Sequence, residues 1–124
     1  MIIARHLALG AVLAALAATT TAAATMRDPV KVDPKHYTIV YENARVRVLH
    51  IHYGPHETSV AHRHPDGVVT YVTDAHIKFR LANGKSVEAR GKAGDALWAP
   101  AGTHTPTNLS DQPMDAVLVE LKRK

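Results

Sequence analysis

Turn-forming residues interrupt this chain every few residues from Glu42 onward, and this spacing limits the possible folds more than any other feature. Between the turns lie short runs rich in Val, Ile, Tyr and Thr: 37–41, 45–53, 68–73, 75–81, 86–89, 96–99 and 114–121. No window keeps the period of a helix. Short runs of this kind are typical of an all-β sandwich or barrel. Asn83-Gly84 predicts a hairpin with a type I′ turn, because both residues tolerate positive φ.

Residues 1–24 differ from the rest and have the features of a secretory signal peptide. Arg5 lies near the start, an apolar run covers 7–18, and small residues end the segment at Ala24. Its Ala- and Thr-rich half is too weakly apolar to hold a bilayer stably. An uncleaved N-terminal anchor is the alternative. We expect cleavage near Ala24, a periplasmic or secreted product, and no stable membrane association after cleavage.

The remaining chain is long enough for one small domain. Residues 25–37 are polar and hold two Asp-Pro pairs, which predicts an extended N-terminal arm, and residues 38–124 form the predicted barrel. The formal net charge of +4 falls by one when Arg5 leaves, and the basic residues form no stripe in the sequence, so nucleic acid is not an expected partner. The absence of cysteine excludes a disulfide scaffold, a Cys-based zinc site and a cysteine nucleophile.

Histidine is the residue type that points to chemistry. The chain has nine histidines, and all but His6 follow the leader. His62 and His64 are two apart, so on a strand both rings point to the same face. His104 follows beside a predicted strand end. Three neutral imidazoles can occupy one face of a transition-metal ion and leave other positions open for water, substrate or dioxygen. The alternative is that the pair lies on a polar, exposed strand end.

The stretches around these histidines resemble the two motifs of the cupin superfamily. In GDALWAPAGTHTPTN the second motif is carried by Gly94, Pro100, Gly102, His104 and Asn108. The family usually has two residues between the last glycine and the histidine, whereas here only Thr103 intervenes. Residues 54–75 resemble the first motif, with its histidine pair, proline turn and strand. The resemblance covers about 38–121 and implies a small single-domain cupin: a double-stranded β-helix, or jelly-roll barrel.

One ligand of the family's usual site is missing. The first cupin motif normally supplies a glutamate at the positions held here by Val68 and Val69, and we expect Val68 to project into the barrel where that glutamate would lie. The resemblance therefore implies a site of three histidines, as in some thiol dioxygenases, and disfavours manganese-oxalate chemistry. Imidazole ligands suit Fe, Mn, Ni, Cu and Zn alike, so the sequence does not identify the metal.

Three further residues are candidate accessory groups. Asp66 lies in a Pro-Asp-Gly turn, where a carboxylate commonly caps backbone, so ligation is the lesser expectation. His56 could reach the barrel mouth, together with Glu57. Tyr71 could point its hydroxyl at a metal-bound ligand, although packing is favoured.

Other conspicuous residues are assigned no ligand role. His50 and His52 alternate with apolar residues and should face outward or onto a partner chain. His36 and His76 resemble ordinary surface residues. Trp98 is expected to have a packing role, with pocket lining as the second expectation.

The functional alternatives belong to different classes. The first is a metal-dependent enzyme, dioxygenase-like or an isomerase or lyase, acting on a small, anionic molecule. The second is a non-catalytic cupin that binds a small molecule or a metal, and the third is an interaction module with vestigial histidines. No catalytic residue beyond the ligands is identifiable. The resemblance also implies a homodimer, formed by packing sheets or by exchanging the segment 28–41.

Overall fold

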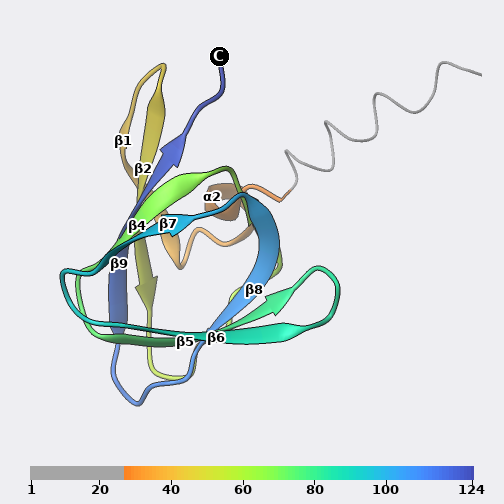
Figure 1. Cartoon of the computed structure of the whole chain (residues 1–124), viewed down its shortest axis with the longest axis vertical. Coiled ribbons are helices and arrows are strands. Elements are labelled where there is room, and N and C mark those ends of the chain that lie inside the picture. The colour runs from red at the N-terminus through yellow and green to blue at the C-terminus, as the bar shows by residue number, and fades with distance from the viewer. Residues whose placement is uncertain (1–26) are drawn as a thin grey trace, which may run out of the picture.

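The computed structural model shown in Figure 1 describes residues 27–124. The predicted signal peptide and its cleavage point lie outside these residues. The described chain contains a one-turn helix followed by nine strands: α2 (Pro29–Val32), β1 (Tyr37–Glu42), β2 (Val46–Tyr53), β3 (His62–His64), β4 (Gly67–Tyr71), β5 (Ala75–Leu81), β6 (Ser86–Gly91), β7 (Ala96–Ala99), β8 (Gly102–Asn108) and β9 (Met114–Leu121). The search of these residues found no helix long and apolar enough to cross a membrane.

The strands form two antiparallel sheets that enclose one core. The order of the five-stranded sheet is β1-β2-β9-β4-β7, and that of the four-stranded sheet is β3-β8-β5-β6. Neighbours in each sheet are mostly distant in sequence, as in a jelly roll. The predicted all-β class is confirmed, and the fold is the cupin double-stranded β-helix.

Alternation along β2 and β9 decides which side chains face the core. Leu49, Ile51 and Tyr53 on β2 are almost fully buried, whereas His50 and His52 lie on the outer face, as their spacing predicts. On β9 the buried positions include Ala116, Leu118 and Glu120, and the outward positions include Asp115 and Val117. One strand thus supplies a carboxylate to each face of the sheet.

The predicted extended arm is wrong over residues 29–32, which form α2. Asp28 caps this helix by accepting a hydrogen bond of 3.2 Å from the Val30 N–H, and Pro29 at the first helical position has its φ preset. The arm also packs on its own barrel, since Asp33, His36 and Tyr37 are buried.

The prediction that His36 is a surface residue is wrong as well. Its ring is 6% exposed and stacks on Tyr53 with centroids 4.4 Å apart. Its Nδ1 lies 2.7 Å from Asp33 Oδ2, and its Nε2 lies 3.0 Å from Glu57 Oε2. Two carboxylates therefore satisfy both ring nitrogens in the interior. The partners are too far apart in sequence for a local pattern to reveal them.

Strand β8 was not predicted, because its sequence contains Pro106 and few apolar residues. Pro106 is tolerated because the pairing of β8 with β3 covers only Gly102 to His104. At Pro106, β8 therefore has a paired strand, β5, on one side only, and the missing N–H can face the other side. The predicted hairpin at Asn83-Gly84 is present, but its type is not I′. Of these two turn residues, only Gly84 has positive φ. The Gly84 N–H donates to the Leu81 carbonyl, which fits a three-residue loop with glycine in the left-handed region.

Candidate metal centre

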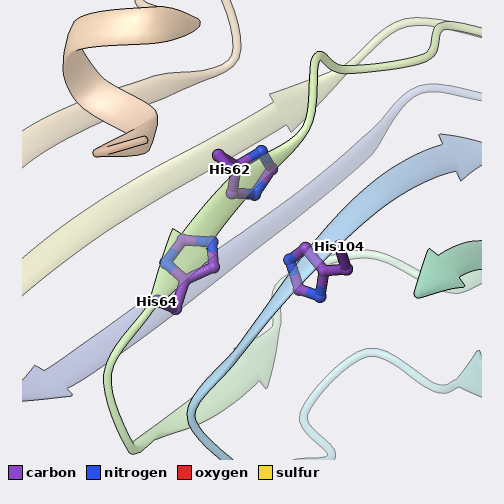
Figure 2. A group of neighbouring side chains, drawn as sticks. All are labelled: His62, His64 and His104. Atoms are coloured by element: carbon purple, nitrogen blue, oxygen red, sulfur yellow. The ribbon is translucent and has the colours of Figure 1, made fainter. Parts of the chain in front are cut away.

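Three histidines predicted to be ligands converge on one point inside the barrel. Figure 2 shows His62 and His64 extending from β3 and His104 from β8, with their rings grouped together. The register places His62 directly opposite His104, and alternation puts His64 on the same face as His62. One ring nitrogen of each residue lies within 4.8 Å of the others. This spacing suits three ligands of one transition-metal ion.

The chain holds the His62 ring in one orientation. Its Nδ1 lies 2.8 Å from the Val60 carbonyl oxygen and 3.2 Å from Ser59 Oγ. A carbonyl only accepts, so Nδ1 carries the proton and Nε2 keeps its lone pair. Ser59 Oγ in turn donates to Asp33, which anchors this support to the N-terminal arm. A backbone carbonyl behind the ring is the support that metal-binding histidines ordinarily have.

His64 is supported by a carboxylate instead. Its Nδ1 lies 2.6 Å from Glu120 Oε1 on β9, while Arg47 Nε donates to Glu120 Oε2 at 2.6 Å. Arg47 also pairs with Asp28 at 2.9 Å. Burial alone would raise the pKa of Glu120, but the hydrogen bonds from His64 and Arg47 outweigh it and hold the pKa below its usual value. The ionised carboxylate therefore fixes the Nδ1–H form of His64 and leaves Nε2 free.

His104 is positioned by packing. Its ring lies against Phe79, with centroids 5.0 Å apart. Burial, followed by the neighbouring His62 and His64, lowers the pKa of His104 to about 3. Burial, followed by the neighbouring His64, lowers the pKa of His62 to about 4. Both rings are therefore neutral at physiological pH, which is the protonation state that a metal requires.

The residues present fit a divalent transition metal. His62 Nε2 is buried and has no hydrogen-bond partner in the described chain. An orphaned buried acceptor is costly, and a metal ion satisfies it when two further imidazole nitrogens lie nearby. Because the donors are all nitrogen, the set suits Fe, Mn, Ni, Cu or Zn better than calcium or magnesium.

An apolar cavity of about 100 Å³ lies inside the barrel beside His104. Side chains from both sheets line it, among them Ile51, Val69, Ile77 and Met114. Three tyrosines line it, and the hydroxyls of two of them, Tyr37 and Tyr53, hydrogen bond to each other at 2.6 Å. Space for a small, largely apolar group therefore adjoins the histidine cluster.

The three accessory candidates lie outside the histidine cluster. Asp66 caps backbone, accepting from the Ala101 N–H at 2.8 Å. His56 is exposed and pairs with Asp111 at 2.6 Å. The Tyr71 ring is buried against Gly91, where an added Cβ would meet it, and Tyr71 also lines the apolar cavity beside His104. His76, with no predicted role, pairs with Glu88 at 2.8 Å on the outer face.

The expectation that Val68 projects into the barrel is wrong. Val68 is 38% exposed and lies on the outer face, whereas Val69 packs against the core and lines the apolar cavity. Alternation along β4 therefore makes Val69 the inward position. The expected packing role of Trp98 is also wrong. Trp98 is 59% exposed and lies opposite Val68 across the β4–β7 pair.

Sequence reasoning missed the groups that support the ligands: Glu120, Arg47, Ser59 and Asp33. The one available signal was a charged residue at an inward position of the apolar run 114–121, since a buried glutamate needs partners. Nothing local linked Glu120 to His64.

Comparison with known proteins agrees with this architecture. The family model Cupin_2, described as a cupin domain, matches residues 49–120. A cupin domain from Bordetella pertussis Tohama I is 29% identical, with 70% of this chain and 92% of that chain covered and a TM-score of 0.65. A conserved protein with a double-stranded β-helix domain from Klebsiella pneumoniae is 25% identical, with 68% and 70% covered and a TM-score of 0.55.

A polyketide cyclase, RemF from Streptomyces resistomycificus, has the same fold at 14% identity, with 68% of this chain and 63% of that chain covered and a TM-score of 0.52. The comparison with curated proteins gave no match. Because the family match spans more than half of the chain, the protein belongs to the Cupin_2 family of cupin domains.

Proposed function

We propose that this cupin domain binds one divalent transition metal through His62, His64 and His104 and presents it to a small, anionic molecule as a dioxygenase-like enzyme. The observation that carries the proposal is the buried, partnerless Nε2 of His62, beside two more imidazoles. Structural histidines normally satisfy both nitrogens when buried, as His36 does. The orphaned nitrogen indicates a group that the protein alone does not supply.

The ligand set supports an anionic ligand. Imidazole ligands, unlike carboxylates, bring no negative charge to a bound metal, and Glu120 lies behind His64, where Arg47 shares it. The metal, when bound, would supply Lewis-acid or redox chemistry at its open positions. Val60, Ser59 and Glu120 hold the rings of His62 and His64 by hydrogen bonds. The apolar wall of the 100 Å³ cavity excludes water beside His104.

A non-catalytic binding role is the second candidate, and one observation favours it. Among the described residues, no carboxylate, lysine or arginine lines the cavity beside His104, and two of its three tyrosine hydroxyls, those of Tyr37 and Tyr53, bond to each other. Burial also raises the pKa of Tyr53 to about 12, and its hydroxyl stays protonated. Such a cavity can hold a ligand without transferring a proton to it.

The two candidates separate in a direct experiment. The protein is stripped with a chelator and reconstituted with each of the five metals, and azide binding is followed by its charge-transfer spectrum. Oxygen uptake is then measured with a panel of small thiols and carboxylates. An enzyme consumes oxygen with at least one substrate, whereas a binding protein takes up azide and ligand without turnover. Failure to retain any metal would refute both forms of the proposal.

The same proposal includes a homodimer formed through the five-stranded sheet. Its outer face carries a continuous cross-strand row of apolar residues, listed from β1 to β7 as Tyr41, Val48, Val119, Val68 and Trp98. The residues at both ends of the row are more than half exposed. Exposed apolar surface of this kind marks association surfaces. Light scattering on the parent and on Trp98→Ser tests it, since a dimer through this face should dissociate in the variant.

Export is proposed on the leader alone. Expressed with residues 1–24 in a bacterium, the protein should appear in the periplasm and begin near Ala24 or Thr25. Mass spectrometry that finds an intact Met1 on a membrane-bound product would contradict this part of the proposal.

A further inference from the structure

A second pocket lies beside β8, separate from the apolar cavity. It has a volume of about 340 Å³, within the range of small-molecule sites, and is lined by Arg27, Arg80, Thr103, Thr105 and residues of the β5–β6 turn. Figure 1 shows this hairpin extending past β8. His104 contributes to the wall of both spaces, so the pocket adjoins the strand that carries a candidate ligand.

Strand register explains why hydroxyls and guanidiniums meet here. Arg80 on β5 lies opposite Thr105 on β8 and opposite Ser86 on β6. Thr103 lies two residues before Thr105 and therefore on the same face. The directly paired neighbours of Arg80 on both sides are thus uncharged hydroxyl residues, and Glu88, two residues from Ser86 on the same face, pairs with His76 instead.

Arg27 is fixed at the other side of the pocket by its main chain. The Arg63 N–H donates to the Arg27 carbonyl at 2.8 Å, and Arg63 lies opposite Thr103. Among the described residues, the arginine ion pairs involve Arg47 and Arg123 but neither Arg27 nor Arg80. Two unpaired guanidiniums therefore line one concave site, and guanidinium is well suited to binding planar or tetrahedral oxyanions.

We propose that this pocket is a binding site for a small oxyanion, a carboxylate or phosphate group, distinct from the histidine cluster. Arg27 and Arg80 donate to the anion from two sides, and the hydroxyls of Thr103 and Thr105 add hydrogen bonds. The lining has no tyrosine, phenylalanine or tryptophan on which a base could stack, which favours a small anion over a nucleic acid. The site is polar and open, so its affinity falls with ionic strength.

The test is a titration of the full protein with inorganic phosphate and with malonate at constant ionic strength, followed by calorimetry. It is run on metal-loaded and on chelator-treated protein, because an anion held by the metal disappears after chelation whereas an anion held by the arginines remains. We expect binding in both forms. Whichever of the two probes binds more tightly identifies the anion class.

The variant Arg27→Gln/Arg80→Gln should weaken this binding at least tenfold, with unchanged metal content. The matched control is Arg90→Gln, an exposed arginine opposite His76 on the same sheet face that does not line the pocket. Equal weakening by Arg90→Gln would overturn the proposal, because it would show diffuse surface charge. Binding that vanishes on chelation, or absence of binding to the parent, would also overturn it. So would tighter binding of a single-stranded oligonucleotide that depends on Arg90.

Discussion

Two histidine pairs in this barrel obey the same spacing rule and have different surroundings. His62 and His64 lie two apart on β3, and His50 and His52 lie two apart on β2. Each pair contacts a carboxylate of β9: Glu120 on the inner face and Asp115 on the outer face. Spacing and a nearby acid are therefore common to both pairs and do not distinguish them.

The difference lies in burial and in the use of each nitrogen. The His50 and His52 side chains are 44% and 50% exposed, and both share one oxygen of Asp115, at 2.8 and 3.0 Å. In the β3 pair each Nδ1 is engaged behind the ring, and His104 approaches from β8 on the inner face. A candidate metal site thus needs supported rings, free nitrogens on one side and a third ligand, all withdrawn from water.

The largest expected contrast is between the two carboxylates. Glu120→Ala leaves His64 Nδ1 without its partner and the largely buried Arg47 guanidinium with Asp28 alone, and it should lower the free energy of unfolding by about 3–5 kcal/mol. Asp115→Ala removes a partly exposed contact and should cost about 1 kcal/mol or less. Urea denaturation of the metal-free proteins measures both. Equal losses would mean that burial does not separate the pairs.

The pH dependence of the metal-free protein should be the next largest effect. The folded-state pKa values of His62, about 4, and of His104, about 3, lie below 6.5, the ordinary value. The unfolded chain therefore binds protons below pH 6.5 that the folded chain does not, and the free energy of unfolding falls as pH drops from 6.5 toward 4.

Above pH 6.5 the contribution of these two histidines is constant. The variant His62→Asn/His104→Asn should flatten the slope between pH 6.5 and 4, as measured by urea denaturation at each pH. A slope identical to that of the parent would contradict the buried, neutral state of both rings.

The hydrogen bonds to His62 Nδ1 should have a smaller effect, and this effect is on metal affinity. Ser59→Ala removes a hydroxyl that contacts both His62 Nδ1 and Asp33, and it should weaken metal binding roughly tenfold. The matched control is Thr58→Ala, which removes a neighbouring exposed hydroxyl bonded to Thr107 at 2.9 Å. Competition with a chromophoric chelator measures the affinities. A loss shared by both variants would show that the effect is not orientation of the ring.

The smallest contrast concerns the two valines at the position of the missing glutamate. Val69→Glu places a carboxylate in the cavity beside His104 and should weaken azide binding several-fold by competing for the metal. Val68→Glu lies on the outer face and should leave azide binding unchanged. Titration of azide into both metal-loaded variants checks the inward position. An effect in Val68→Glu alone would reverse the assignment.

Much of the fold follows from patterns of period two and from turn chemistry. The alternation in residues 46–53 correctly separates the inward Leu49 and Ile51 from the outward His50 and His52. The cluster of His62, His64 and His104 followed from the same rule together with the motif resemblance. These features are local, or depend on strand pairing that the family shares, so the sequence suffices for them.

The rest depends on contacts between distant segments. His64 meets Glu120 across 56 residues and Ser59 meets Asp33 across 26, and neither contact has a local signature. The side of β4 that Val68 faces depends on register, which a shift of one residue reverses. His36 is buried because two distant carboxylates satisfy it, and Trp98 is exposed because its short strand is at the edge of the sheet.

The most direct test of the account is the metal content of purified protein by mass spectrometry, for the parent, His62→Ala and His50→Ala. The account predicts close to one divalent transition metal per chain in the parent and in His50→Ala, and almost none in His62→Ala with circular dichroism unchanged. Unchanged metal content in His62→Ala, or its loss in His50→Ala, would contradict the assignment of the site to the inner face of β3 and β8.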